Sequence, residues 1–176
     1  MQALTGQNIH LRALEPSDID FLFSIENDES FWEVSATQTP FSRFILEQYI
    51  ASAHQDIYEV KQLRLIIANN VTGENIGMID LFDFVPQHRR AGIGILVVES
   101  EQGKGYASEA LQLLIGYGFK QLNLHQLFAN ITADNTKSLA LFKKHNFTKV
   151  GVKKEWIFSK GTFKDEVLFQ LINRTP

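Results

Sequence analysis

The segment Gln102-Gly103-Lys104-Gly105-Tyr106-Ala107 combines two glycines with the start of a helix, a pattern suited to binding a phosphate. Glycines at positions 103 and 105 let the backbone turn sharply and come close to a ligand. The backbone N–H groups in the first turn of a helix have no intrahelical partners, and the helix dipole adds partial positive charge there. We therefore expect a phosphate or pyrophosphate site. On these six residues alone, a turn that merely joins a strand to a helix is an equally good interpretation.

The residues around this segment exclude two other nucleotide-binding loops. No Gly-Lys-Ser/Thr follows at the spacing of a Walker loop. The third glycine of a dinucleotide fingerprint and its flanking parallel strand–helix–strand unit are also missing. A phosphate-bearing ligand of another kind is therefore expected.

The composition of the 176 residues restricts the chemistry further. There is no cysteine, which excludes disulfides, thiolate zinc sites and a cysteine nucleophile, and we expect no bound metal. The formal net charge is −3 and no run of lysine and arginine stands out, which argues against a nucleic-acid partner. No apolar run is long enough to span a bilayer and the first 14 residues lack a signal-peptide core, so we expect a soluble, cytoplasmic protein without membrane contact.

The elements that must position the loop are a strand before it and a helix after it. Residues 91–98 are nearly all apolar, which predicts a central strand covered on both faces. Residues 107–119 show the apolar spacing of an amphipathic helix. Neither a linker nor an internal repeat interrupts the chain, so residues 1–176 are expected to form one domain.

The remaining patterns predict a mixed α+β fold with the order β–α–α–β–β–β–α–β–α–β–β. Three consecutive strands between residues 63 and 98 have short links, which predicts an antiparallel meander. Helices are expected from residue 16, from a cap at Ser42 to about residue 54, and over 135–145. The other predicted strands are 9–13, 127–131, 147–158 and 162–171. This order indicates a mostly antiparallel sheet flanked by helices, not a doubly wound one.

The loop and a second segment resemble the GNAT superfamily of N-acetyltransferases. Gln102, Gly105 and Ala107 fill its pyrophosphate-loop pattern, Gln/Arg-x-x-Gly-x-Gly/Ala. A second family pattern, Asn-x-x-Ser-x-x-Leu-x-x-Lys-x-x-Phe, is matched at Asn135, Ser138, Leu141, Lys144 and Phe147. The opening at residues 9–18 is similar to the branch of spermidine/diamine and ribosomal-protein-alanine acetyltransferases. The resemblance covers residues 9–173 and implies the GNAT fold.

The resemblance also implies how acetyl-CoA binds as co-substrate. Main-chain groups of Val97 and Val98 would pair with the pantetheine arm, and the Asn135 side chain would hydrogen-bond it, with Ser138 nearby. By its position Asn135 suits a helix cap equally well, and an amide can fill both roles. The pyrophosphate would lie on the loop and the first helical turn, which comprise Gln102, Gly103, Lys104, Gly105, Tyr106, Ala107 and Ser108.

The implied reaction is direct transfer, in which a neutral amine attacks the thioester carbonyl and a donor stabilises the oxyanion. The sequence departs from the family at two points of this chemistry. Many members use a tyrosine to protonate the departing thiolate, but the matching residue here is Phe142, which cannot donate a proton. The glutamate that relatives often carry before the loop is absent from residues 91–94.

Asp80 and Asp83 are the candidate replacements for the missing catalytic carboxylate. Because they are three residues apart, they should face opposite sides of a regular strand, so at most one reaches a cleft unless a bulge intervenes. Each also suits a solvated strand end.

Trp32 and Glu33 are the candidate residues for binding the acceptor, because the segment that holds them borders the acceptor site in the family. The first functional hypothesis is acetylation of a small amine such as a polyamine. Acetylation of a protein N-terminal amine is the alternative within enzymes. A catalytically silent acyl-CoA-binding module is a third hypothesis, which Phe142 keeps open, and association into a homo-oligomer also stays open.

Overall fold

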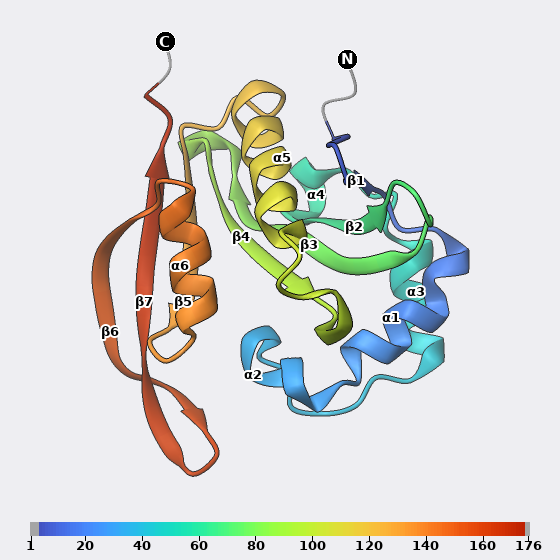
Figure 1. Ribbon diagram of the computed structural model, residues 1–176, viewed down its shortest axis with the longest axis horizontal. Coiled ribbons are helices and arrows are strands. Elements are labelled where there is room, and N and C mark those ends of the chain that lie inside the picture. Colours follow the sequence, from blue (N-terminus) through green and yellow to red (C-terminus); the bar gives the residue numbers. More distant parts are fainter. Residues whose placement is uncertain (1–3, 175–176) are drawn as a thin grey trace.

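The computed structural model describes residues 4–174, which form one seven-stranded sheet with helices on both faces (Figure 1). The strand order is β1-β2-β3-β4-β5-β7-β6. The strands are β1 (Ile9–Arg12), β2 (Leu63–Asn69), β3 (Asn75–Val85), β4 (Arg90–Val97), β5 (Gln126–Thr132), β6 (Thr148–Ser159) and β7 (Thr162–Ile172). The helices are α1 (Ile19–Glu26), α2 (Trp32–Ser35), α3 (Arg43–Ala51), α4 (Ile57–Val60), α5 (Tyr106–Lys120) and α6 (Thr136–Lys144).

The alternation of side chains along the central strands builds two hydrophobic cores, one on each face of the sheet. Leu111 and Leu114 of α5 pack with Ile79 of β3 on one face. Leu22 of α1 and Leu46 of α3 pack with Met78 of β3 on the other. Because both faces are covered, β4 can be apolar along nearly its whole length, as the sequence predicts.

The predicted α+β fold is confirmed, with a mostly antiparallel sheet and the expected order of its main elements. Ser42 caps α3 as predicted, since its hydroxyl accepts a hydrogen bond from the N–H of Ile45. The short helices α2 and α4 are not among the predicted elements. Within residues 4–174, no helix is both long enough and apolar enough to cross a membrane.

The one parallel pair in the sheet, β4 with β5, is joined only from Arg90–Gln126 to Gly92–Phe128. Beyond this point β4 and β5 diverge. The divergence begins at Gly92, where the ring of Phe82 would lie 2.4 Å from an added Cβ. Phe82 reaches across Gly92 to make an edge-to-face contact with Phe128. Two aromatic rings thus pack at the last paired residues. Beyond them, the edge of β4 that faces β5 forms no strand pairing.

Asp18 fixes the start of α1 to the sheet. It is the one fully buried charged residue among residues 4–174. Arg12 of β1 donates to both carboxylate oxygens at 2.8 Å, and the amide of Asn75 donates at 2.8 Å. Burial alone would raise the pKa of Asp18, but the hydrogen bonds from Arg12, the Glu15 N–H and Asn75 outweigh it, so this pKa is lowered.

We predict that Asp18→Ala lowers the free energy of unfolding by about 3 kcal/mol at pH 7, because it breaks a buried ion pair and leaves Arg12 unpaired. Urea unfolding measures this. Since the pKa of Asp18 is lowered, its contribution is complete above the ordinary aspartate pKa. It is lost as the pH falls through the lowered value, so the difference from wild type should shrink in acid.

Asp20→Ala is the matched control, because the Asp20 carboxylate is exposed and pairs with Arg43 on the surface. Its cost should be about 0–1 kcal/mol. Equal losses in the two variants would contradict a special role for the Asp18 network.

Candidate functional site

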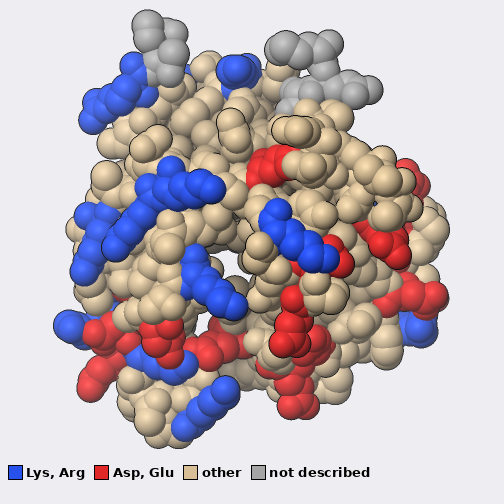
Figure 2. All heavy atoms as spheres, in the orientation of Figure 1, with Lys and Arg blue, Asp and Glu red and all other residues tan. Residues whose placement is uncertain are grey.

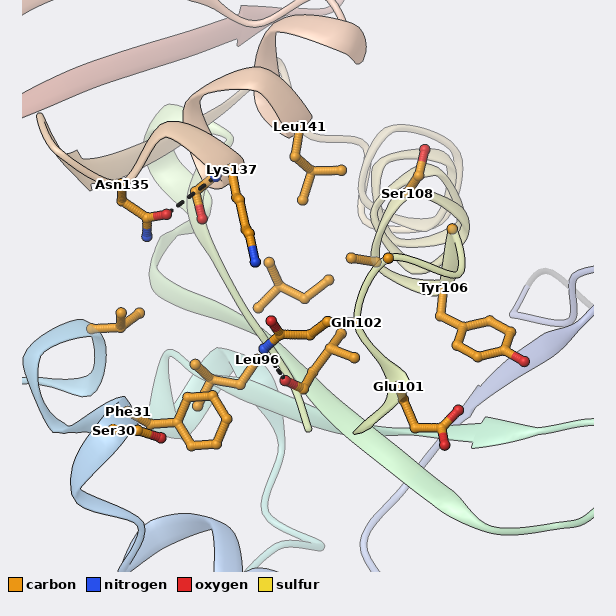
Figure 3. Close-up of a pocket in the computed structure, with 17 residues that line it drawn as sticks. Ser30, Phe31, Leu96, Glu101, Gln102, Tyr106, Ser108, Asn135, Lys137 and Leu141 are labelled. Carbon is orange, nitrogen blue, oxygen red and sulfur yellow. Dashed lines mark hydrogen bonds between the residues drawn. The ribbon is translucent and has the colours of Figure 1, made fainter. Parts of the chain in front are cut away.

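A cavity of about 570 Å³ opens where β4 leaves β5 (Figure 3). Its walls come from the end of β4, the loop at residues 101–105, the first turns of α5 and α6, and the segment around Phe31. Apart from Val98, all the residues expected to bind the cofactor line this cavity or belong to its loop. The fold therefore brings together two motifs that are about thirty residues apart in the sequence.

The loop before α5 has the backbone shape that its glycines suggest. Gly103 and Gly105 have φ values of 76° and 86°, in the left-handed region that a side chain makes costly. Gly105 is the residue that precedes α5, so the N–H groups of the first helical turn begin at the cavity. Glu109 holds this turn against β1, since its carboxylate accepts from the N–H of Asn8 at 2.8 Å. The loop thus presents a preformed anion site.

The charges around the cavity also favour an anion. The ammonium group of Lys104 pairs with Glu101 at 3.1 Å, which cancels that carboxylate locally. Lys137 extends from α6 into the cavity toward Gln102 (Figure 3) and has no ion-pair partner among residues 4–174. With the α5 N-terminus, Lys137 leaves the cavity positive.

Ser108 links the loop to α6. Its hydroxyl lies 2.8 Å from Nε2 of His145, which ends α6. The pKa of His145 is lowered, first by burial and then by the charge of Lys144, so the neutral ring is favoured. With its hydroxyl engaged, Ser108 offers the cavity chiefly its backbone N–H.

The free edge of β4 supplies backbone groups to the gap. Hydrogen-bonded and non-bonded pairs alternate along an antiparallel ladder. Because the N–H of Val98 donates to the carbonyl of Ile76, the even-numbered residues of β4 are the ones that bond to β3. The odd-numbered residues Ile93, Ile95 and Val97 therefore turn their N–H and C=O groups toward the gap. The side chain of Gln102 donates to the Val97 carbonyl at 2.9 Å.

Val98 does not offer the backbone groups expected of it. Its N–H donates to the carbonyl of Ile76, and its own carbonyl accepts from the N–H of Glu101. Ile95 and Val97 therefore turn backbone groups toward the gap, and Val98 does not.

A second cavity of about 130 Å³ lies deeper in the gap, between β4, β5, α2 and the β6–β7 hairpin. Four residues line both cavities: Val34, Ile95, Asn135 and Ser138. The carbonyl oxygen of the Asn135 side chain accepts from the Ser138 N–H at 3.2 Å, so Asn135 caps α6 and keeps its NH₂ group free. These four residues mark the junction at which a ligand in one cavity would meet a ligand in the other.

Two carboxylates line the second cavity. Glu33 of α2 accepts a hydrogen bond from Lys164 of β7 at 2.7 Å, and Glu166 pairs with Lys153 at 2.8 Å. Lys164 also contacts Asp134 at 2.7 Å, and its pKa is raised by Asp134 and by Glu33. The face in Figure 2 is hollowed near its centre, with basic side chains around the upper part of the hollow and acidic side chains gathered below it.

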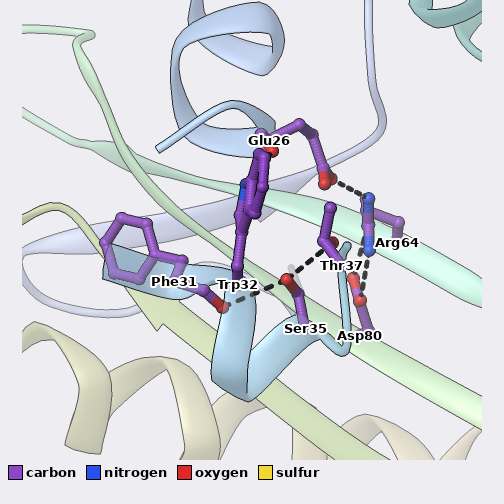
Figure 4. A network of polar contacts seen from close by, with 7 residues as sticks. All are labelled: Glu26, Phe31, Trp32, Ser35, Thr37, Arg64 and Asp80. Carbon is purple, nitrogen blue, oxygen red and sulfur yellow. Dashed lines mark hydrogen bonds and ion pairs between the residues drawn. The ribbon is translucent and has the colours of Figure 1, made fainter. Parts of the chain in front are cut away.

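The geometry argues against both aspartates proposed as catalytic carboxylates. Asp80 lines neither cavity and receives two hydrogen bonds from Arg64, at 2.9 and 2.8 Å (Figure 4). Burial would lower the pKa of Arg64, but Asp80, Tyr49 and Glu26 outweigh it and raise this pKa. Asp83 lies in a bulge with φ 46°, on the exposed end of β3, and lines neither cavity. A bulge was the condition under which both aspartates could reach a cleft, but this bulge does not bring Asp83 to either cavity.

Trp32 lines neither cavity, in contrast to its neighbour Glu33. Its indole N–H donates to the Glu26 carbonyl at 3.0 Å, which joins α2 to the end of α1 (Figure 4). The side chain thus positions the segment that carries Glu33 and Val34. Phe142 lines the second cavity and is buried against Phe147.

Lys137, Lys164 and Glu166 were not found by sequence reasoning. Lys137 carried a signal, since it lies between Asn135 and Ser138 in the second motif. Lys164 and Glu166 carried none, because charged residues alternating along a strand usually face solvent. Among residues 4–174, no group of three or more His, Asp or Glu side chains is placed to hold a metal ion.

Comparisons with known proteins agree with this geometry. A family model for the acetyltransferase (GNAT) domain matches residues 8–148. An uncharacterised N-acetyltransferase, p20 of Bacillus licheniformis, is 31% identical over 99% of this chain and 98% of its own. Spermidine N(1)-acetyltransferase of Escherichia coli K12 is 26% identical over 93% of this chain and 85% of its own. The crystal structure of Vibrio cholerae spermidine N-acetyltransferase with CoA and spermine superposes with a TM-score of 0.86 at 24% identity, covering 95% of this chain and 96% of that one.

We predict that Gly105→Glu weakens CoA binding at least about tenfold, equivalent to ~1.4 kcal/mol, as measured by calorimetry. The side chain would strain a backbone with φ 86° and place a negative charge at the anion site. Gly116→Ala is the control, because Gly116 lies inside α5 with open space around it. It should leave CoA affinity unchanged and stabilise the helix by up to about 1 kcal/mol. Unchanged affinity in a folded Gly105→Glu protein would remove this loop from the site.

Proposed function

Because the chain belongs to the GNAT acetyltransferase family, we propose that it transfers the acetyl group of acetyl-CoA to a primary amine of a small polycation such as a polyamine. The observation that carries this proposal is the junction of two cavities that differ in their polar groups. The larger cavity has the N-terminus of α5 and the unpaired Lys137, which suit CoA. The smaller one is lined by Glu33 and Glu166, which already bind the ammonium groups of Lys164 and Lys153. The spermidine acetyltransferases among the relatives, at 26–27% identity, support the same substrate class.

Acetyl-CoA would lie along the larger cavity, with its pyrophosphate on the α5 N-terminus and its pantetheine arm beside β4. The Gln102 side chain donates a hydrogen bond to the Val97 carbonyl, and we propose that an amide N–H of pantetheine replaces this donor when CoA binds. Lys137 would balance part of the phosphate charge. This placement puts the thioester at the four residues shared by the two cavities.

The amine would approach through the smaller cavity and attack the thioester carbonyl directly. The N–H of Ile95 points into the gap and would donate to the developing oxyanion. No carboxylate is among the four junction residues, so the proton of the ammonium would leave through water toward Glu33 or Glu166. Contact of the amine with the apolar side chains of Val34 and Ile95 would favour its neutral form.

Lys164 would act as a stand-in for the second ammonium group of the substrate. Its own ammonium bridges Glu33 and Asp134 near the small cavity, which is where a cationic substrate tail would be attracted. Exchange of one ammonium for another leaves each carboxylate paired. A molecule with two amines would therefore be favoured over a monoamine of similar length.

We predict that Glu33→Gln combined with Glu166→Gln raises the KM for spermidine about tenfold more than the KM for hexylamine. The change removes two attractive charges, leaves Lys153 without its partner and leaves Lys164 paired with Asp134 alone. Wild type should also lose apparent affinity for spermidine as salt increases, because salt screens these charges. Steady-state kinetics with acetyl-CoA measure both effects.

Glu59→Gln combined with Glu74→Gln is the matched control, because it removes the same charge from two exposed positions. It should leave the ratio of catalytic efficiencies for the two amines unchanged. If the Glu33 and Glu166 variant also leaves this ratio unchanged, these carboxylates do not bind the acceptor. Turnover of peptide N-termini in preference to spermidine would favour the protein-acetylating alternative.

We also infer that copies of the chain associate, since a V. cholerae spermidine N-acetyltransferase that is 26% identical, with a TM-score of 0.80, is described as dodecameric. The β6–β7 hairpin exposes Trp156, Phe158 and Phe163, which suits an interface. Light scattering should give a mass above the 20.0 kDa of one chain, and a monomer at micromolar concentration would contradict this.

A further inference from the structure

His145, at the end of α6, is a titratable residue that reaches the larger cavity through one neighbour. Its Nε2 lies 2.8 Å from the hydroxyl of Ser108, and Ser108 lines that cavity. The ring of His145 lines a third cavity, of about 440 Å³, which is formed by α5, the end of α6 and the end of β7. The acetyl transfer proposed above makes no use of this ring.

The charged groups around His145 are basic. Lys144 of α6 and Arg174, which follows β7, line the third cavity with it, and α5 contributes no titratable side chain there. Glu109 is the carboxylate next to Ser108 in the chain, but it is turned to the N–H of Asn8. Among residues 4–174, no acidic side chain lines the third cavity. The pKa of His145 is therefore lowered, first by burial and then by Lys144.

The direction of the hydrogen bond between Ser108 and His145 depends on the protons of the ring. A serine hydroxyl has one hydrogen to donate, whereas each ring nitrogen of histidine can accept or donate. In a neutral ring with its hydrogen on Nδ1, Nε2 accepts from Ser108, and the hydroxyl is turned away from Gln102 (Figure 3). In the imidazolium, Nε2 donates to the Ser108 oxygen, and the hydroxyl hydrogen becomes free for a ligand.

A phosphate group of CoA is the ligand that would favour the second arrangement. Ser108 lies in the first turn of α5, beside the loop that suits an anion. A phosphate there would accept from the freed hydroxyl and would stabilise the positive ring of His145. Because coupling between two binding equilibria is reciprocal, phosphate binding would favour protonation and protonation would favour phosphate binding.

We propose that His145 is a positioning residue that takes up a proton when CoA binds and so turns the Ser108 hydroxyl toward a phosphate group of CoA. This inference rests on the proposed binding of acetyl-CoA. The proton comes from solvent and adds to the ring, and Ser108 keeps its own proton. The affinity for CoA therefore rises as the pH falls through the pKa that His145 has in the complex. It levels off below the lowered pKa that His145 has without CoA.

Calorimetry with CoA and with 3′-dephospho-CoA, between about pH 5 and pH 8, tests the proposal. Repeating each titration in buffers of different ionisation enthalpy gives the number of protons taken up on binding. The 3′-phosphate of CoA itself titrates near about pH 6, and dephospho-CoA lacks this group but keeps the pyrophosphate. We expect wild type to bind dephospho-CoA about three- to fivefold more tightly at the acid end of the range, the size expected of one partly exposed charge pair.

His145→Gln is the main variant, because glutamine can still hydrogen-bond Ser108 but does not titrate. It should bind both ligands within about twofold of wild type at about pH 8, and it should take up fewer protons. Ser108→Ala keeps the ring but removes the hydroxyl, so its proton uptake should also fall below that of wild type. His54→Gln is the control, because His54 is exposed, bonds the Ala51 carbonyl and lines none of the three cavities.

The difference in proton uptake between wild type and His145→Gln decides the outcome. A difference with both ligands assigns the contact to the pyrophosphate, and a difference with CoA alone assigns it to the 3′-phosphate. Equal uptake in the two proteins would overturn the role of His145, and wild-type uptake in Ser108→Ala would reject the path through Ser108. If wild type binds neither ligand at any pH, the proposed function fails together with this inference.

Discussion

The divergence of β4 from β5 is the constraint on which the site depends. Two parallel strands that stayed paired would satisfy each other's backbone groups and leave no room between them. Here the pairing ends at Gly92 and Phe128, and the ring of Phe82 lies over Gly92 and contacts Phe128 at this point. Beyond Gly92, the N–H and C=O groups on this edge of β4 are available to a ligand, because no strand pairs with them. Both cavities, and the junction between them, exist because of this gap.

The gap also separates two kinds of charge. The N-terminus of α5 and Lys137 border the larger cavity, whereas Glu33 and Glu166, each paired with a lysine, border the smaller one. Two groups of ion pairs differ in burial and in the number of hydrogen bonds. Arg64 holds Asp80 through two hydrogen bonds and also contacts Glu26, in a largely buried arrangement that would be costly to break. Lys164 holds Glu33 through one, so a substrate ammonium can compete with it.

The sequence predicted the parts of the site that are local. A few neighbouring residues are enough to predict each of these features: the glycine turn before α5, the cap at Asn135 and the apolar strand β4. The order of the predicted helices and strands then gives the fold class. A single residue, Phe142, likewise shows that the family's tyrosine is absent from this position. The predictions for Asp80, Asp83, Trp32 and Val98, which line neither cavity, all depended on which partner lies beside the residue. Asp80 was a plausible base until Arg64, sixteen residues earlier, was found against it.

What the sequence determined by itself is therefore the set of elements and the chemistry of the anion loop, because helix ends and glycine turns are governed by neighbours in the chain. What only the tertiary structure decided is which carboxylates face the cleft and where the two cavities meet. Glu33 reaches Lys164 across 131 residues, and Ser138 gains its place through packing of α6 over the gap. Strand register and helix packing set these contacts, and no local pattern specifies them, because both depend on the hydrophobic burial of the whole chain.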